Sequence, residues 1–442
     1  MKRVLLTLTI ILVIGNLSFS QITDEAITLT NSLSELWSNG ETEKAIESSV
    51  ELYRLYPPLL IMRIHNSLAQ QIQKDSKLYG QKYLEQLSLK KNEGINKIIF
   101  PIYLWSRTLS ATTANDLKNL TEELNHLLTD SANYESETER YCLLILQDLD
   151  KKNAIDDRSK EKILQKNIKN LEAYPYITKV AIGRKEREKR AWHRYLLAFS
   201  YNYLYTLKPI EEYLKKASDY SPDITDRQHS SAYFYDAALL TGNIREFGFQ
   251  NKYQKYLVDN NRNSEALDLL SSIAFGNPSD SNIKTLHEFC ERLNNKTPFN
   301  DYWKNYVHNM GKSVPRVKIQ FEKEELDLTN IPDKWIYIDV WGTWCNPCRE
   351  ELPELQSFYI ENINNSNSNL KIYTFSFNSQ KLADFMNDNK YTFPVSEIDK
   401  QTNDLFEVTG YPTKILISPD GHYIKIPYGV DWKMFIKNYT LM

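Results

Sequence analysis

The sequence predicts a multidomain protein in which an all-α helical array is followed by a smaller α/β domain. Up to Met310, apolar residues recur at three- and four-residue spacing, which is typical of helices. After Gly311 the pattern changes to short alternating or continuous apolar runs, which are typical of strands. The density of glycine and proline roughly doubles at the same point, as a turn-rich mixed fold requires. We therefore expect a domain boundary close to residue 310.

The first residues have the composition of a targeting segment. Two basic residues follow the initial methionine and precede an apolar run, Val4–Ile14, which is short for a membrane span. Ser18 and Ser20 occupy the minus-three and minus-one positions before Gln21, as at a signal-peptide cleavage site. Residues 1–20 are therefore interpreted as a cleaved signal peptide, and we expect export to the bacterial periplasm of a mature chain that does not span the membrane. An uncleaved membrane anchor is the alternative.

Residues 21–310 are expected to form the helical array. The clearest helical patterns lie at 22–37, 41–56, 114–128 and 263–275. Three times, a proline follows an apolar residue by twelve positions, at Pro57, Pro222 and Pro278. This interval resembles the second helix of tetratricopeptide repeats and its terminating proline, and an unclassified helical array is the alternative. In either case this half offers a surface for a protein partner and no catalytic constellation.

The elements after residue 310 alternate between strands and helices. Strands are predicted at 316–321, 334–341 and 370–377, helices at 348–363, 379–389 and 431–441, and a hairpin at 413–426. The run at 334–341 is continuously apolar, which indicates a strand buried on both faces. The hairpin turns at Asp420-Gly421, a dipeptide that favours tight turns. This order predicts a compact α/β domain over residues 311–442.

Two of the four cysteines, Cys345 and Cys348, enclose Asn346 and Pro347 where the buried strand gives way to a helix. A zinc site needs four ligands, and after this pair the only further Cys or His is His422. A structural disulfide would close a very small ring and constrain the unfolded chain little. A redox-active dithiol is therefore the favoured interpretation, and neither a metal nor a cofactor is expected.

The place of the pair in the chain predicts how it reacts. A sulfur at the start of a helix meets unpaired N–H groups and the positive end of the helix dipole, which lower the pKa of a thiol at Cys345. Cys348 follows one turn later, within reach of a mixed disulfide on Cys345. Pro347 suits a first helical turn because it lacks an N–H. The attacking nucleophile is thus expected to be Cys345.

The remaining cysteines and the net charge limit which disulfides and which binding partners are expected. The other two cysteines, Cys142 and Cys290, lie in helical apolar patterns and are expected to be buried free thiols, although a disulfide between them stays open. The net charge of −3 argues against a nucleic-acid partner recruited by overall basicity.

A proline also stands at the start of the predicted hairpin. In "GYPTKILI", a cis Tyr411–Pro412 bond would expose the backbone of Tyr411 for pairing with a substrate chain. A trans proline at the start of an edge strand is the alternative.

Together, "DVWGTWCNPC" and "GYPT" resemble the thioredoxin superfamily, and "GKSVPRVKIQF", "REELPEL" and "ISPDGHYI" are similar to its exported TlpA/ResA-like branch. The resemblance covers residues 311–442 and implies a thioredoxin fold and thiol-disulfide oxidoreductase activity. On the matching positions it makes Cys345 the nucleophile, Cys348 the resolving thiol and Pro412 a cis-proline. It also matches Glu351 to an acidic residue near the active site.

The resemblance further implies how the site is framed. Trp341 and Trp344 match the aromatic residues around the cysteine pair. We expect Trp344, Tyr411, Asn346 and Pro347 to contact the substrate.

Asp339 departs from the pattern of the branch. Many TlpA-like sequences have a neutral residue six positions before the first cysteine, whereas cytoplasmic thioredoxins have a buried aspartate there. Asp339 and Glu351 are therefore expected to flank the dithiol. A buried carboxyl group has a raised pKa and would accept the proton of Cys348 during exchange. A hydrogen-bonded Asp at the strand end without a catalytic role is the alternative.

These features predict an exported thiol-disulfide oxidoreductase that reduces disulfides in client proteins. The resemblance implies a membrane-embedded thiol donor that recharges the dithiol, while the helical array would recruit or orient the client. The alternative from another class is a helical interaction scaffold with an accessory thioredoxin-like domain. A peroxidase of the peroxiredoxin type would need a lone cysteine with a threonine three positions before it, a pattern that this CxxC does not fit.

Overall fold

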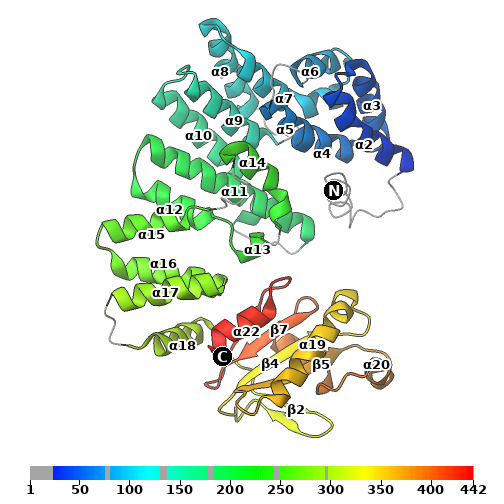
Figure 1. The fold of residues 1–442 in the computed structure, drawn as a ribbon, viewed down its shortest axis with the longest axis vertical. Coiled ribbons are helices and arrows are strands. Elements are labelled where there is room, and N and C mark those ends of the chain that lie inside the picture. The colour runs from blue at the N-terminus through cyan, green and yellow to red at the C-terminus, as the bar shows by residue number, and fades with distance from the viewer. Residues whose placement is uncertain are drawn as a thin grey trace. The chain divides into compact units, whose positions relative to one another are not determined.

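The computed structural model describes residues 23–74, 80–129, 137–177, 183–227, 229–242, 248–293 and 297–441 (Figure 1). The expected signal peptide, residues 1–20, lies outside them. Among the described helices, none is both long and apolar enough to cross a lipid bilayer. The chain divides into two compact units, of which the first runs to Pro222 and includes His229–Tyr253. The second contains a short segment that starts at Asp223 and the residues from Gln254 onward.

Helices make up the described part of the first unit, as predicted. They are α2 (Asp24–Ser38), α3 (Thr42–Leu55), α4 (Pro57–Met62), the π-helical η2 (Arg63–Leu68), α5 (Ala69–Lys74), α6 (Gly80–Ser88), α7 (Glu93–Ser110), α8 (Ala114–Thr129), α9 (Thr138–Lys151), α10 (Asp157–Glu172), η4 (Pro175–Ile177), α11 (Arg184–Leu207), α12 (Glu211–Tyr220), η5 (Ser230–Ala232) and α14 (Phe234–Thr241). Several of these helices begin at a polar N-cap residue. The side chains of Thr23, Asn92 and Asp156 accept hydrogen bonds from backbone N–H groups in the first turns of α2, α7 and α10. The buried faces of the helices share one hydrophobic core, which includes Cys142, a free and fully buried thiol.

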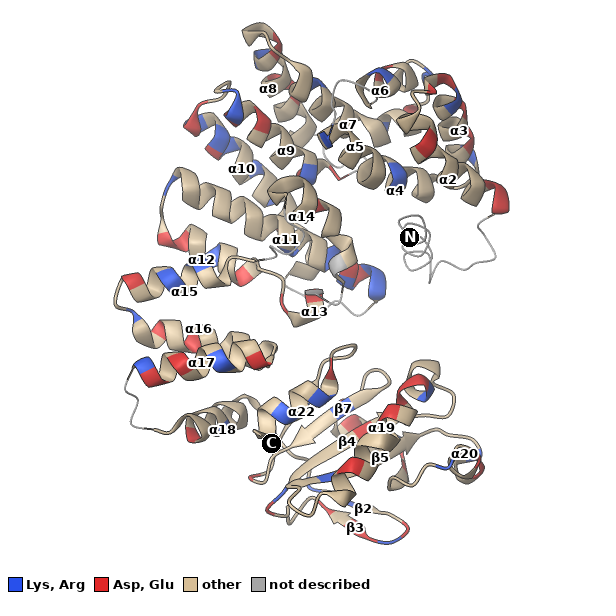
Figure 2. Cartoon of the chain, in the orientation of Figure 1, with Lys and Arg blue, Asp and Glu red and all other residues tan. Residues whose placement is uncertain are grey.

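The prolines that suggested a repeat lie at helix ends. Pro57, Pro222 and Pro278 each stand two residues after the end of a helix, namely α3, α12 and α16 (Asn263–Gly276). A proline at that place cannot continue the helix. The helices between these points differ widely in length, and the likeness to tetratricopeptide repeats stays a prediction. Basic and acidic residues are interspersed along the helices (Figure 2), as is typical of solvated helix faces.

The second unit joins the last helices of the array to the α/β domain. Its helices before the sheet are α13 (Ile224–Arg227), most of α15 (Gln250–Asp259), α16, α17 (Asp280–Arg292) and α18 (Phe299–Met310). The indole N–H of Trp303 on α18 donates to the carbonyl of Asn438, at 2.8 Å, and the ring of Phe275 on α16 stacks on Tyr439. Asn438 and Tyr439 belong to the closing helix α22 (Trp432–Thr440). The second compact unit therefore includes α16, α17 and α18 together with the α/β domain, and the domain boundary near residue 310 stays a prediction.

A six-stranded mixed sheet organises the α/β domain, with the strand order β1-β8-β7-β4-β5-β6. Its strands are β1 (Lys312–Ser313), β4 (Trp335–Trp341), β5 (Leu370–Phe377), β6 (Val395–Ile398), β7 (Thr413–Ile417) and β8 (His422–Ile426); β2 (Lys318–Gln320) and β3 (Glu325–Asp327) form a separate ribbon, and the further helices are α19 (Asn346–Asn364), α20 (Leu382–Asp388) and α21 (Lys400–Leu405). β4, β5 and β6 are parallel, whereas β7 runs antiparallel to β4 and β8 antiparallel to β7. The predicted strands, helices and hairpin are present.

Strand β4 lies at the centre of the sheet and is buried along its whole length. Successive side chains of a strand point to opposite faces. Ile336 and Ile338 pack in the core that the β2–β3 ribbon covers. On the other face Tyr337 stacks on Trp432 of α22. Asp339, two residues after Tyr337, therefore faces the side of the sheet that α22 covers, and this alternation brings a carboxyl group under the active-site turn.

Candidate active site

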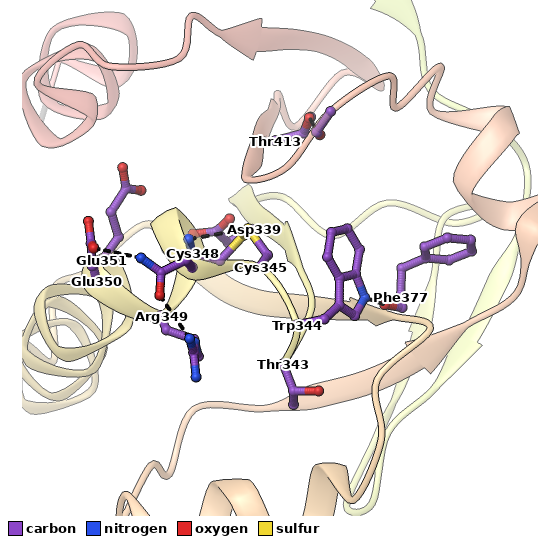
Figure 3. Close-up of a disulfide and its surroundings, with 12 residues drawn as sticks. Asp339, Thr343, Trp344, Cys345, Cys348, Arg349, Glu350, Glu351, Phe377 and Thr413 are labelled. Atoms are coloured by element: carbon purple, nitrogen blue, oxygen red, sulfur yellow. Dashed lines mark hydrogen bonds between the residues drawn. A yellow bond between two sulfur atoms is a disulfide. The ribbon is translucent and has the colours of Figure 1, made fainter. Parts of the chain in front are cut away.

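The cysteine pair stands where β4 leads into α19. Cys345 is the N-cap residue of α19, and its sulfur accepts the backbone N–H of Cys348 at 3.3 Å. The two sulfurs form a disulfide (Figure 3). Cys345 is 5% exposed and Cys348 1% exposed, so the N-cap cysteine is the more exposed residue of the two. A helix N-terminus of this kind stabilises negative charge on a sulfur, as the sequence interpretation required.

The two residues between the cysteines form the first turn of α19. Pro347 occupies the second helical position, where its missing N–H removes no helical hydrogen bond. The amide of Asn346 donates to Glu350 at 2.9 Å and accepts from Arg349 at 2.8 Å. This pair of contacts holds Asn346 against the helix. Its expected contact with a substrate stays a prediction.

An aromatic wall lies beside the disulfide and consists of Trp344, Tyr411 and Phe377. The Tyr411–Pro412 peptide bond is cis and immediately precedes β7. The Trp344 ring meets Tyr411 edge-on, with 5.1 Å between the ring centroids. The indole N–H of Trp344 donates to the carbonyl of Phe377 at 3.0 Å (Figure 3). The Tyr411 hydroxyl donates to Asn403 at 2.9 Å. Trp344 is nevertheless 53% exposed, so this wall presents an apolar surface to solvent beside the cysteines.

Trp341 is the last residue of β4, four positions before Cys345, and its expected place in the aromatic frame around the pair stays a prediction. It is fully buried at the end of β4 and packs against Phe385 and Phe393. It contributes to the core that supports the active-site turn, at the end of a central strand that is buried on both faces.

Asp339, Glu351 and Lys414 form a charge cluster beneath the turn, in which Asp339 and Lys414 are buried and Glu351 is partly exposed. The Lys414 ammonium forms an ion pair with Glu351 of α19 and lies 3.6 Å from the Asp339 carboxylate. Asp339 on β4 and Lys414 on β7 are register partners across the antiparallel strand pair. The Tyr337 hydroxyl donates to Asp339 Oδ2 at 3.4 Å. The lysine thus joins the two carboxylates that the sequence had predicted on either side of the dithiol.

Burial governs the protonation of this cluster. It raises the pKa of Asp339 to about 6, with Lys414 pulling it down and Glu351 pushing it up. Burial also opposes the charge of Lys414, but the attraction of the two carboxylates outweighs it and raises the pKa of the ammonium group. Asp339 therefore changes its charge close to neutral pH while Lys414 stays protonated.

Lys414 is the site residue that the sequence interpretation missed. It lies two positions after Pro412, in the strand "TKILI", and its side chain is only 7% exposed. A lysine inside an otherwise apolar strand is the signal that was available, because a buried ammonium group requires a charged partner.

An Asp339→Asn variant is expected to lose a pH dependence of disulfide exchange, because Asp339 is predicted to accept the proton of Cys348. The carboxylate accepts a proton only when it is ionised, so the wild-type rate should rise as the pH increases through about 6. In the variant that rise should vanish, and the rate at pH 7 should fall about tenfold. Stopped-flow measurement of reduction of a model disulfide between pH 4.5 and 8.5 tests this, and an unchanged profile would exclude the proton-accepting role.

Fold and site together define a thioredoxin-fold domain that carries a redox-type CxxC pair and a cis-proline. The model of the AhpC/TSA family matches residues 310–425. Thiol-disulfide oxidoreductase ResA of Bacillus subtilis (strain 168) is 29% identical over 119 residues, which cover 26% of this chain and 65% of that relative, just under two thirds of its length. Sporulation thiol-disulfide oxidoreductase A of the same organism is 30% identical over 140 residues, covering 29% of this chain and 80% of that relative.

Through its C-terminal domain the chain belongs to this family of thiol-disulfide oxidoreductases. Among solved structures, the crystal structure of StoA from Bacillus subtilis is 25% identical and covers 28% of this chain and 99% of that chain, with a TM-score of 0.25. The thioredoxin domain of a thiol-disulfide oxidoreductase from Bacteroides vulgatus is 20% identical and covers 29% of this chain and 96% of that chain, with a TM-score of 0.26.

Proposed function

We propose that this protein is exported and reduces disulfides in client proteins with the Cys345–Cys348 dithiol. The observation that carries the proposal is the placement of the Cys345 sulfur at the N-cap of α19, where it accepts the N–H of Cys348. That placement favours a thiolate in the reduced protein. The composition of residues 1–20 supports export.

The reaction transfers two electrons from the dithiol to the client. The Cys345 thiolate attacks one sulfur of the client disulfide, whose S–S bond breaks and releases the first client thiolate. The Cys348 thiol then gives its proton to the Asp339 carboxylate, and its thiolate attacks the Cys345 sulfur of the mixed disulfide. The second client thiolate leaves, and the protein is left with the disulfide that the structure contains. An external thiol donor, proposed to be embedded in the membrane, must reduce this bond before the next turnover.

The client is proposed to bind across the cis-proline and the aromatic wall. An extended peptide can pair with the backbone of Tyr411, the residue that precedes the cis bond ahead of β7. Trp344 then covers the client next to the attacked disulfide, because its ring is exposed and fixed by its hydrogen bond to Phe377. The helical array is proposed to recruit or orient the client before this contact.

A Trp344→Ala variant is expected to raise the KM for a protein disulfide roughly tenfold, as loss of an aromatic anchor does. Turnover of a small aromatic disulfide reagent, which needs little binding surface, should change much less. Tyr428→Ala, which removes an aromatic side chain that is 55% exposed, is the matched control and should leave both values unaltered. Equal losses for the protein and the small substrate would contradict the client-binding role.

The reduction potential tests the direction of the proposed reaction. Equilibration of the full chain with glutathione buffers, followed by quantification of the Cys345–Cys348 disulfide, should give a value below about −200 mV. A value near −120 mV, typical of strong oxidants, would overturn the reductase assignment. The alternative of a scaffold with an accessory domain predicts no turnover of insulin disulfides, which the same preparation can measure.

A further inference from the structure

Three side chains of metal-ligating type meet at the opposite end of β7 from Pro412. His308 lies in the last turn of α18. Asp420 lies in the turn between β7 and β8, and His422 is the first residue of β8. His308 Nδ1 is 2.5 Å from Asp420 Oδ2, and His422 Nδ1 is 3.9 Å from Asp420 Oδ1. One ligand atom from each of the three lies within 4.8 Å of the others, and in the described part of the chain no other group of three does so.

We propose that His308, Asp420 and His422 bind a divalent transition-metal ion of the zinc type. Two imidazoles and a carboxylate form a donor set that suits zinc, and three protein ligands leave a fourth position for water. The side chains of His308 and His422 are 33% and 28% exposed, and that of Asp420 is 52% exposed, so an ion can enter from solvent.

The spacing of the ligand atoms fits such an ion. With bonds of about 2.0–2.1 Å, ligand atoms of a tetrahedral zinc site lie about 3.3 Å apart. The distances from the Asp420 carboxylate to the two ring nitrogens, 2.5 and 3.9 Å, lie on either side of that value, and small side-chain rotations would equalise them. Both Nδ1 atoms are buried and make no hydrogen bond to the described residues, although each faces the carboxylate. An ion between them would satisfy both nitrogens.

The surrounding backbone holds the three ligands in place. The Ser418 hydroxyl donates to the Asp420 carboxylate, and the backbone N–H of His422 donates to the Ser418 oxygen at 3.2 Å. After α18 the chain enters β1, which pairs with β8 so that Ser313 stands opposite His422. A Cβ atom at Gly311 would lie 2.9 Å from the Cβ of His422, so the absence of a side chain there permits the close approach. Supporting contacts of this kind orient the ligands of metal sites.

The ion would link the helical array to the α/β domain. His308 ends the last helix before the sheet, while Asp420 and His422 follow more than a hundred residues later. Bonds from one ion to both segments would fasten α18 to the β7–β8 hairpin, next to the contacts that already join α18 to α22. This role is independent of the cysteine chemistry, so neither proposal depends on the other.

Isothermal titration of the full mature chain with Zn²⁺ tests the site, with the Cys345–Cys348 disulfide kept oxidised so that no thiolate there can ligate. One ion per chain is expected to bind, and His308→Ala and His422→Ala should each weaken binding at least 30-fold. His287→Ala removes an exposed histidine that lies 3.5 Å from Glu291 on α17, and this matched control should bind as the wild type does. Circular dichroism without metal checks that each variant folds.

A second measurement needs no variant. Electron paramagnetic resonance of the wild-type chain with one equivalent of Cu²⁺ should show coupling to two imidazole nitrogens, and Zn²⁺ should displace the copper signal. Loss of binding in His287→Ala equal to that in His422→Ala would overturn the proposal. So would the absence of two-nitrogen coupling, or a wild-type affinity no higher than that of His308→Ala, and the cluster would then be only an ion pair between His308 and Asp420.

Discussion

A Cys345→Ser variant is expected to reduce insulin disulfides at least about 1,000-fold more slowly than the wild type, because it loses the attacking thiolate. The serine hydroxyl at the N-cap of α19 can still accept the N–H of residue 348, so the helix start should be preserved. The variant should therefore lose its activity while it keeps its fold. The turbidity of reduced insulin measures the activity, and near-ultraviolet circular dichroism measures the fold.

A Cys348→Ser variant should instead stop halfway through the reaction. The mixed disulfide between Cys345 and the client forms but has no resolving thiol, so mass spectrometry should detect a covalent adduct. Cys290→Ser is the control, since that thiol is free and buried on α17 and should leave turnover unaltered. Turnover by Cys345→Ser above a tenth of the wild-type value, or no adduct on Cys348→Ser, would contradict the assigned roles.

The helices and strands of the α/β domain could be predicted where the pattern of apolar residues within a single segment indicates the element. The continuous apolar run of β4 and the amphipathic pattern of α19 are local, and both elements formed within about two residues of their expected ends. The short strands β1, β3 and β6 were missed. Each has two to four residues, too few for a period to appear, and each is defined by its pairing with a neighbouring strand.

The active site was predictable to the extent that its spacing is local. Cys345 and Cys348 lie one helical turn apart, and their motif is continuous in the sequence. Lys414 was not predicted, because its proximity to Asp339 arises only from the antiparallel register of β4 and β7.

Contacts between distant segments explain the remaining differences. His308 and His422 are far apart in the sequence, and His308 belongs to the helical half, so the sequence pattern does not indicate that the two histidines lie close together. Likewise, Trp303 looks like any aromatic residue of a helix core, yet its indole N–H binds the backbone of α22. Such pairings depend on how α18 packs on the sheet domain, which no periodicity encodes.

A Lys414→Met variant is expected to lower the free energy of unfolding of the α/β domain by about 3 kcal/mol at pH 7, because it leaves a buried carboxylate without its cation. The pKa of Asp339, about 6 in the wild type, should rise further once the lysine that lowers it is absent. The folded state then holds a proton that the unfolded state has released, so stability falls as the pH rises from about 4 through the folded pKa. The variant should therefore be closest to the wild type near pH 4 and most destabilised above pH 7.

Hydrogen exchange of the β4 and β7 amides measures this locally, which matters in a chain with two compact units. Lys425→Met on β8 is the matched control: its side chain is 33% exposed and lies 3.9 Å from Glu407, so the loss should stay within about 1 kcal/mol. Combining Asp339→Asn with Lys414→Met removes both buried charges and should recover much of the lost stability. If the double variant were as unstable as Lys414→Met, packing of the lysine stem, and not its charge, would account for the effect.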